Sequence, residues 1–333
     1  MRRAAIRPLI FLSAGILSAG LLLSSAVARG PQAQMRNSNQ EIVANLATGR
    51  VIVCVTRDGM LVGAISEKSE PGSHSPLFVP LVGGHMAVML GAVEWVDLNS
   101  GKPPVRLDTA LKSVSGVATH NVGNIDPNEA GDLEGLGMAF LEKLRPVAGE
   151  LHHELRVKEN EPILQIVVAG YEKDYGPEVW LLSYKLQQRE LRDDYWDTLA
   201  MRPTYEQLYP PEKKAPRTLV EARYPPELKG ITFQEMLEQN DARLIPARQA
   251  DPKAREAAQL ILDGASQKTN PDGATAFLKG AMQAAADPGA NLTLAILHEG
   301  DRLDWIIPPT DVPAKPDDKK RDADAPTLRA PHH

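Results

Sequence analysis

RVIVCVTRDGMLVGAISEKSEPGSHSPLFVPLVGGHMAVMLGA, residues 50–92, carries the strongest structural signal in the chain. It contains two pairs of apolar runs, joined by turns at Asp58-Gly59 and Gly83-Gly84. An Asp-Gly step between apolar runs is a strong signal for a β-hairpin. The runs are apolar at consecutive positions, which is typical of strands covered on both faces. The sequence therefore predicts two hairpins in a sheet that is buried on both sides.

Further apolar runs predict a third hairpin around 173–177 and a closing strand pair around Glu299-Gly300-Asp301. Helical spacing of apolar residues predicts helices over 39–46, 132–144, 252–267 and 273–286, with a short helix inside 231–240. The remaining stretches, 97–131 and 191–250, are rich in proline or polar residues and read as irregular. Strands that are apolar on both faces, together with amphipathic helices, predict an α+β fold. The expected architecture is a four-layer αββα sandwich.

The N-terminal residues have the pattern of a secretory signal. Three arginines precede an apolar stretch, and Ala26-Val27-Ala28 forms a small-x-small cleavage site. We expect residues 1–28 to be removed and the protein to be exported, either to a periplasm or out of the cell, with no stable membrane span left after cleavage. An uncleaved membrane anchor is the alternative. We expect 29–38 to be loose, 39–307 to form one domain, and the Pro- and charge-rich residues 308–333 to be disordered.

Composition narrows the classes of partner. The chain is 43% hydrophobic and 24% charged, as in ordinary globular proteins. Its net charge of −6, the lack of a Lys/Arg cluster and an aromatic content of 5% argue against binding of nucleic acid. The single cysteine, Cys54, lies in an apolar run. We interpret it as a core residue and not a nucleophile.

No motif in the sequence predicts a metal or a cofactor. His152 and His153 are adjacent, so on a helix their side chains point about 100° apart and do not form one site. The polar loop around His120 matches no calcium-loop spacing. His85 opens an apolar run, which favours a structural histidine. We therefore predict no metal site and no cofactor site.

The runs in 48–92, closed by Gly91-Ala92, and an aliphatic run ending in Ala169-Gly170-Tyr171 resemble proteasome-type subunits of the N-terminal-nucleophile (Ntn) hydrolase fold. The resemblance extends in outline over 40–307 and implies the four-layer sandwich. The helix expected before the first strand, together with Glu67-Lys68, is closer to the non-catalytic class of subunits. Where family members have a helix, this chain has Pro103-Pro104 and a polar loop, which argues against a ring-forming surface.

Active members of that family use a free N-terminal threonine assisted by a lysine and an aspartate. The resemblance places these groups at Thr48, near Leu77 and at Ile65, so two of the three are missing. Exposing Thr48 would also require a cut after Ala47. We therefore assign no catalytic residue and expect a catalytically silent binding or scaffold module that associates with itself or with a protein partner. Two alternatives stay open: a threonine-type amidohydrolase or peptidase activated by cleavage before Thr48, and a carrier of a small ligand between the sheets.

Overall fold

The computed structural model describes residues 42–67, 74–97, 102–118, 131–149, 161–172, 175–192, 195–211, 219–226, 228, 230–300 and 302–310. The predicted signal peptide, the segment 29–38 and nearly all of the predicted tail lie outside these residues. His120 and the His152-His153 pair also lie outside them.

The strands form two antiparallel sheets, and the class is α+β. Sheet A contains β1 (Ile42–Ala47), β4 (Leu77–Pro80), β5 (Met86–Asp97), β6 (Val105–Arg106), β7 (Pro162–Glu172), β8 (Gly176–Arg192), β9 (Tyr195–Ala200) and β10 (Thr204–Tyr209). Sheet B contains, in spatial order, β11 (Leu219–Tyr224), β2 (Gly49–Val55), β3 (Met60–Ser66), β12 (Leu292–Leu297) and β13 (Leu303–Ile307). The helices are α1 (Leu107–Ala118), α2 (Gly131–Gly149), α3 (Phe233–Glu238), α4 (Ile245–Gln249), α5 (Pro252–Leu262) and α6 (Pro271–Ala285).

The predicted hairpins are confirmed. β2 and β3 pair around the Asp58-Gly59 turn, β4 and β5 around Gly83-Gly84, and β7 with β8 forms the third hairpin. β12 and β13 form the closing pair. Every residue of β3 is buried, as is all of β2 except Arg50, so the prediction of a doubly covered sheet is also confirmed.

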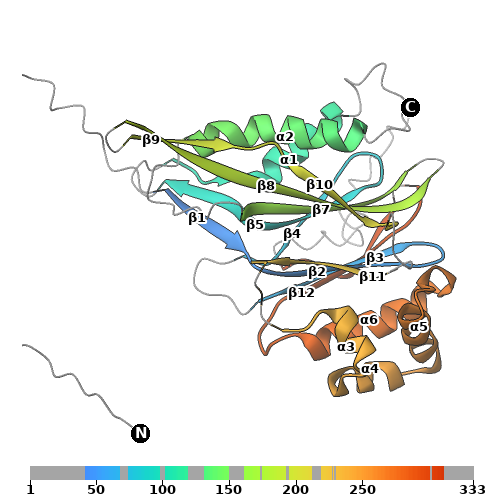
Figure 1. The fold of residues 1–333 in the computed structure, drawn as a ribbon. Coiled ribbons are helices and arrows are strands. Elements are labelled where there is room, and N and C mark those ends of the chain that lie inside the picture. Colours follow the sequence, from blue (N-terminus) through green and yellow to red (C-terminus); the bar gives the residue numbers. More distant parts are fainter. Residues whose placement is uncertain are drawn as a thin grey trace, which may run out of the picture. The chain divides into compact units, whose positions relative to one another are not determined.

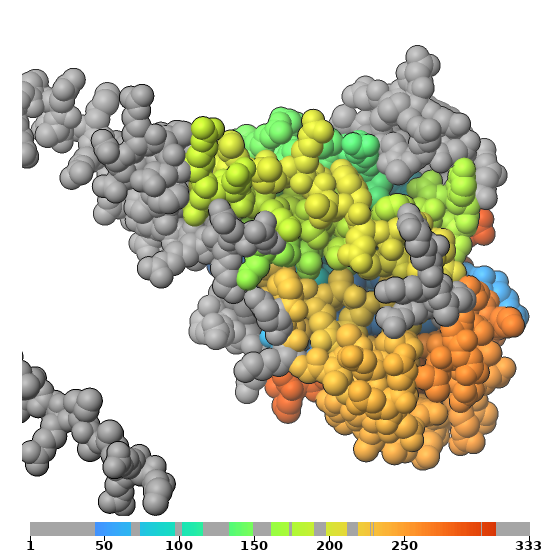
Figure 2. Space-filling view, in the orientation of Figure 1, coloured from blue at the N-terminus to red at the C-terminus, as the bar shows by residue number. Residues whose placement is uncertain are grey.

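Three apolar clusters account for this burial. One lies between sheet A and helices α1 and α2 and includes Leu111 and Phe140. A second lies between the two sheets and includes Val53 and Val88. The third lies between the other face of sheet B and helices α3 to α6, with Phe277 fully buried. Figure 1 shows the helices on the outer side of each sheet, and Figure 2 shows residues from about 230 to 285 as one mass over sheet B.

Two expectations are wrong. Residues 42–46, within the helix predicted over 39–46, belong to strand β1, which pairs with β5 from Ile42↔Asp97 to Ala47↔Gly91. A short helix is only marginally stable alone. Strand β5 offers these residues a ladder of backbone hydrogen bonds, broken by one register shift between Asn45 and Leu46. In the loop-rich stretch 97–131 the structure has helix α1, whose Leu107, Leu111 and Val114 are buried at helical spacing. A helix therefore follows Pro103-Pro104, where the sequence predicted a loop.

The irregular stretch 191–250 also contains more order than expected. It holds β9, β10 and β11 besides the predicted short helix, which is α3. The peptide bonds Tyr209-Pro210 and Tyr224-Pro225 are cis and lie at the ends of β10 and β11. Helix α2 continues past Pro146 to Gly149, and the two later helices match the predicted ones with somewhat different ends.

Candidate functional site

Thr48 lies where the chain passes from one sheet to the other. It is the single residue between β1 of sheet A and β2 of sheet B. Its backbone N–H donates to the carbonyl of His74 at 3.3 Å, and its carbonyl accepts from the N–H of Glu67 at 3.1 Å. Both backbone groups of Thr48 are thus hydrogen-bonded to neighbouring segments.

The two positions that the resemblance pairs with Thr48 bring no charge to it. Ile65 pairs with Arg50 in the β2–β3 register and belongs to the apolar cluster beneath α3 to α6. Leu77 packs against the cluster beneath α1 and α2. An aliphatic side chain cannot lower the pKa of an amine or hold a lysine in place. The lysine and aspartate roles therefore have no occupant at these positions.

A polar group that the sequence did not reveal lies near this crossing. The Glu94 carboxylate accepts from Asn45 Nδ2 at 2.7 Å, and its Oε2 lies 3.2 Å from His74 Nε2. His74 is also the residue whose carbonyl binds the Thr48 amide. These three side chains connect β1, β5 and the segment before β4. Its members are far apart in the sequence, so no spacing pattern could have predicted it.

A second hidden cluster joins sheet B to the start of α3. The Glu221 side chain is only 6% exposed. Its carboxylate accepts from Arg223 Nε and from the Phe233 N–H, each at 2.6 Å, and lies 4.0 Å from Arg50 Nη1. Burial lowers the pKa of Arg50, and the nearby Glu221 opposes that shift. The Glu221 carboxylate thus partners two half-buried guanidinium groups and binds the first turn of α3, but the cluster contains no nucleophile.

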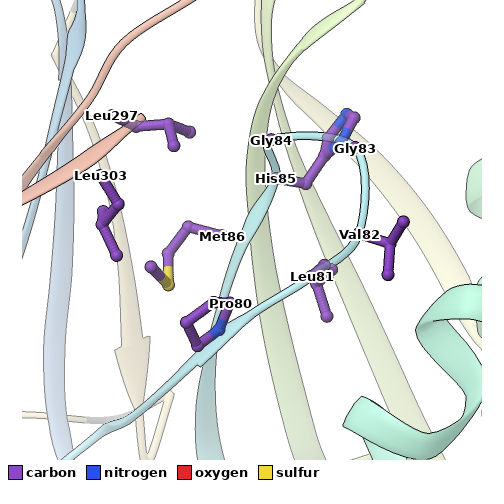
Figure 3. Close-up of a pocket in the computed structure, with 9 residues that line it drawn as sticks. All are labelled: Pro80, Leu81, Val82, Gly83, Gly84, His85, Met86, Leu297 and Leu303. Carbon is purple, nitrogen blue, oxygen red and sulfur yellow. The ribbon is translucent and has the colours of Figure 1, made fainter. Parts of the chain in front are cut away.

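At the opposite end of β2 and β3 lies an open pocket of about 250 Å³. Its lining comes from the β4–β5 hairpin of sheet A and from the β12–β13 hairpin of sheet B: Pro80, Leu81, Val82, Gly83, Gly84, His85, Met86, Leu297 and Leu303. In Figure 3 Met86 projects toward the side where Leu297 and Leu303 lie, whereas the His85 ring points away from them. The wall therefore combines apolar side chains with exposed polar backbone.

His85 behaves as a satisfied structural histidine within the described residues. Its Nε2 lies 3.1 Å from Glu172 Oε1. Burial by itself would lower the pKa of His85, but the hydrogen bond and charge of Glu172, with the backbone of Gly83 and Val82, raise it above the ordinary value. The charged form of the ring is thus favoured where it sits.

Cys54 is buried and carries no disulfide. Burial raises the pKa of its thiol to about 12, although a hydrogen bond with Ser266 opposes the shift. Because the thiolate is the reactive form, Cys54 is not a nucleophile near neutral pH.

Within the described parts of the chain, no group of three or more His, Cys, Asp or Glu side chains is arranged to hold a metal ion. Across those same residues, none of the helices combines the length and apolar character needed to cross a membrane. No protein-family model and no curated protein matches this sequence.

Proposed function

We propose that this protein is an exported, catalytically silent binding or scaffold module, built on the four-layer αββα sandwich of the Ntn-hydrolase fold. The order of apolar clusters, from α1–α2 through the two sheets to α3–α6, supports that assignment of the fold. So does the antiparallel order β11-β2-β3-β12-β13 of sheet B.

One observation carries the proposal that the protein is catalytically silent. The positions that would hold the aspartate and the lysine carry the aliphatic Ile65 and Leu77, which pack into the apolar clusters. In Ntn-type catalysis the threonine amine acts as the base for the hydroxyl, and a nearby lysine tunes the pKa of that amine. A Thr48 amine released by cleavage would therefore lack its supporting charges.

The second candidate is a threonine-type amidohydrolase or peptidase released by a cut after Ala47. Its support is positional, since Thr48 directly precedes a buried strand of sheet B. The Thr48 N–H also donates to the backbone carbonyl of His74, a residue whose side chain pairs with Glu94.

Mass spectrometry of the mature protein under denaturing conditions separates the two. Denaturation is needed because β1 is hydrogen-bonded to β5 and would stay attached after a cut. A chain beginning at Arg29 supports the module, and a chain beginning at Thr48 overturns it. In the second case the Thr48→Ala variant should stay uncut, whereas Thr56→Ala should be processed normally.

Binding is tested separately. Light scattering coupled to size-exclusion chromatography of the purified mature chain should show a stable dimer or higher assembly, or a co-purified protein partner. A strictly monomeric protein without a partner, together with turnover of peptide amide substrates, would contradict the module.

A further inference from the structure

Two arginines lie opposite each other on neighbouring strands of sheet B. Arg50 of β2 pairs with Arg223 of β11 in the antiparallel register, so their side chains leave the same face of the sheet. Ile52 and Leu219, on that face, belong to the cluster beneath α3 to α6. The two arginine side chains are only 15% and 14% exposed. Because like charges directly opposite each other repel, this pair is unfavourable unless negative charge lies close to both.

One carboxylate serves both guanidinium groups. Glu221 accepts from Arg223 Nε at 2.6 Å and lies 4.0 Å from Arg50 Nη1. Burial lowers the pKa of Arg50, Glu221 opposes that shift, and Arg223 adds to it. The weaker effects of Glu67 and Arg243 on the same pKa have opposite directions. Two positive charges therefore share one close negative charge, which leaves one positive charge unbalanced in a place with little exposure to water.

The backbone satisfies some of the guanidinium N–H groups, but one nitrogen has no acceptor. Arg50 Nη1 donates to the Ile231 carbonyl at 3.2 Å, and Arg223 Nη1 donates to the Gly230 carbonyl at 2.8 Å. Arg223 Nη2 is buried, and within the described part of the chain it has no hydrogen-bond partner. A buried donor without an acceptor costs free energy, and a bound ion is one way in which proteins satisfy such a group.

The backbone of Gly230 leaves room beside Arg50. Gly230 is exposed and has a φ of 106°. Apart from the adjacent residues, a Cβ placed on Gly230 would meet one described neighbour within 4 Å, Arg50 Nη2 at 3.4 Å. The guanidinium group of Arg50 therefore faces an open position that a side chain on residue 230 would fill, and a small group can reach that position from solvent.

We propose that Arg50 and Arg223 form a binding site for the carboxylate group of a small organic acid, held beside Gly230. A guanidinium group presents parallel N–H donors that match the two oxygens of a carboxylate. One carboxylate also balances the single positive charge that Glu221 leaves, whereas a doubly charged anion would bring a net negative charge into a partly buried place. The site goes beyond the proposed function, because it does not depend on whether the chain is cut before Thr48.

Arginine side-chain NMR of the mature protein, labelled with ¹⁵N, tests the site with sodium acetate at neutral pH and constant ionic strength. The signals of Arg50 and Arg223 should shift along a saturating curve with a Kd on the order of 1 to 10 mM, as expected of a ligand with four heavy atoms. Acetamide, which has the same shape without the charge, should shift neither signal. Shifts that do not saturate, or equal shifts with acetamide, would overturn the proposal.

Arg243 supplies a matched control. It is bound to Asp241 at 2.7 Å but is 53% exposed, so its charge already has a partner of its own. Its signal should not follow acetate, and Arg243→Gln should change the Kd by less than about twofold. Arg223→Gln should weaken acetate binding about tenfold, the effect of losing a charge-assisted hydrogen bond. Equal effects of the two substitutions would show general attraction of anions and would overturn the site.

A pair of glycine variants keeps the test decisive if Arg223→Gln does not fold. Gly230→Ala places a methyl group in the proposed site, whereas a Cβ on Gly289 would meet nothing within 4 Å. Both positions have positive φ, 106° and 90°, so both variants carry backbone strain. Calorimetric titration with acetate should show binding weakened about fivefold or more in Gly230→Ala and unchanged in Gly289→Ala. Unchanged binding in Gly230→Ala, or equal weakening in both variants, would contradict the proposal.

Discussion

The backbone of Gly49 lies directly against the carbonyl oxygen of Ile65, so close that a Cβ on Gly49 would overlap that oxygen. Gly49 also has a φ of 143°, which side chains rarely adopt. Gly49→Ala should therefore lower the free energy of unfolding by about 3 kcal/mol, from strain together with overlap. Urea denaturation measures the change.

Gly289 separates the two causes. Its φ is 90°, but a Cβ there would meet nothing within 4 Å. Gly289→Ala should cost about 1 kcal/mol, from backbone strain alone. Equal losses in the two variants would show that contact with Ile65 has no energetic role.

Because the Glu221 carboxylate is buried among its partners, we expect its removal to cause a large loss of stability. Glu221→Ala leaves Arg223 and Arg50 without their shared partner and removes the acceptor of the Phe233 N–H. Removing one member of a buried ion pair costs about 3 to 5 kcal/mol. Chemical denaturation should show a loss in this range. Glu142→Ala breaks the exposed pair with Arg145 and should change stability by less than about 1 kcal/mol. Comparable losses in both would contradict this account.

Tyr184 links sheet A to helix α2 through its hydroxyl. Tyr184 is fully buried, and its hydroxyl donates to the Gly137 carbonyl at 3.0 Å. Its ring packs edge-on against the ring of Phe140, with 5.3 Å between the ring centroids. Tyr184→Phe keeps the ring but removes the hydrogen bond, so unfolding should be easier by about 1 kcal/mol. Tyr205→Phe removes a longer, exposed bond of 3.3 Å to Glu134 and should cost less. The thermal midpoints of the two variants provide the comparison.

The burial of Cys54 leads us to expect an unreactive thiol in the native protein and a stability that depends on pH. Because burial raises the pKa of its thiol to about 12, native protein at neutral pH should not react with a disulfide reagent, whereas urea should expose one reactive thiol. The unfolded thiol ionises at about 8.5. Cys54 thus stabilises the fold below that pH, and the contribution is lost as the pH rises toward 12. Cys54→Ala should show a shallower fall in stability above about pH 9. Rapid reaction of the native thiol would refute this.

The β-hairpins could be predicted because their information is local. Asp58-Gly59 and Gly83-Gly84 define turns, and the flanking residues are apolar enough to be recognised as buried. Helix α1 was missed because its buried Leu107, Leu111 and Val114 are interrupted by polar residues and follow a proline pair. Strands β10 and β11 were missed because TYEQLY and LVEARY mix polar and apolar residues, and their burial depends on the neighbours they meet.

The polar clusters could not be predicted for a different reason. Glu94 meets Asn45 and His74, and Glu221 meets Arg50, only after distant strands are paired. Such contacts have no signature in the spacing of residues. His85 was interpreted as structural, and its bond to Glu172 could not be predicted because it follows from the β5–β7 register.

The strand order of sheet B has a consequence for how the nascent chain folds. All strands of sheet A lie between Ile42 and Tyr209, whereas β2 must wait for β11, which follows sheet A in the chain, and β3 must wait for β12, which is made much later. Pairings between distant segments form slowly, and unpaired apolar strands aggregate while they wait. During translation the β2–β3 hairpin is apolar on both faces and lacks both neighbours. A chain truncated after β10 should therefore accumulate as insoluble material, even though every strand of sheet A has been made.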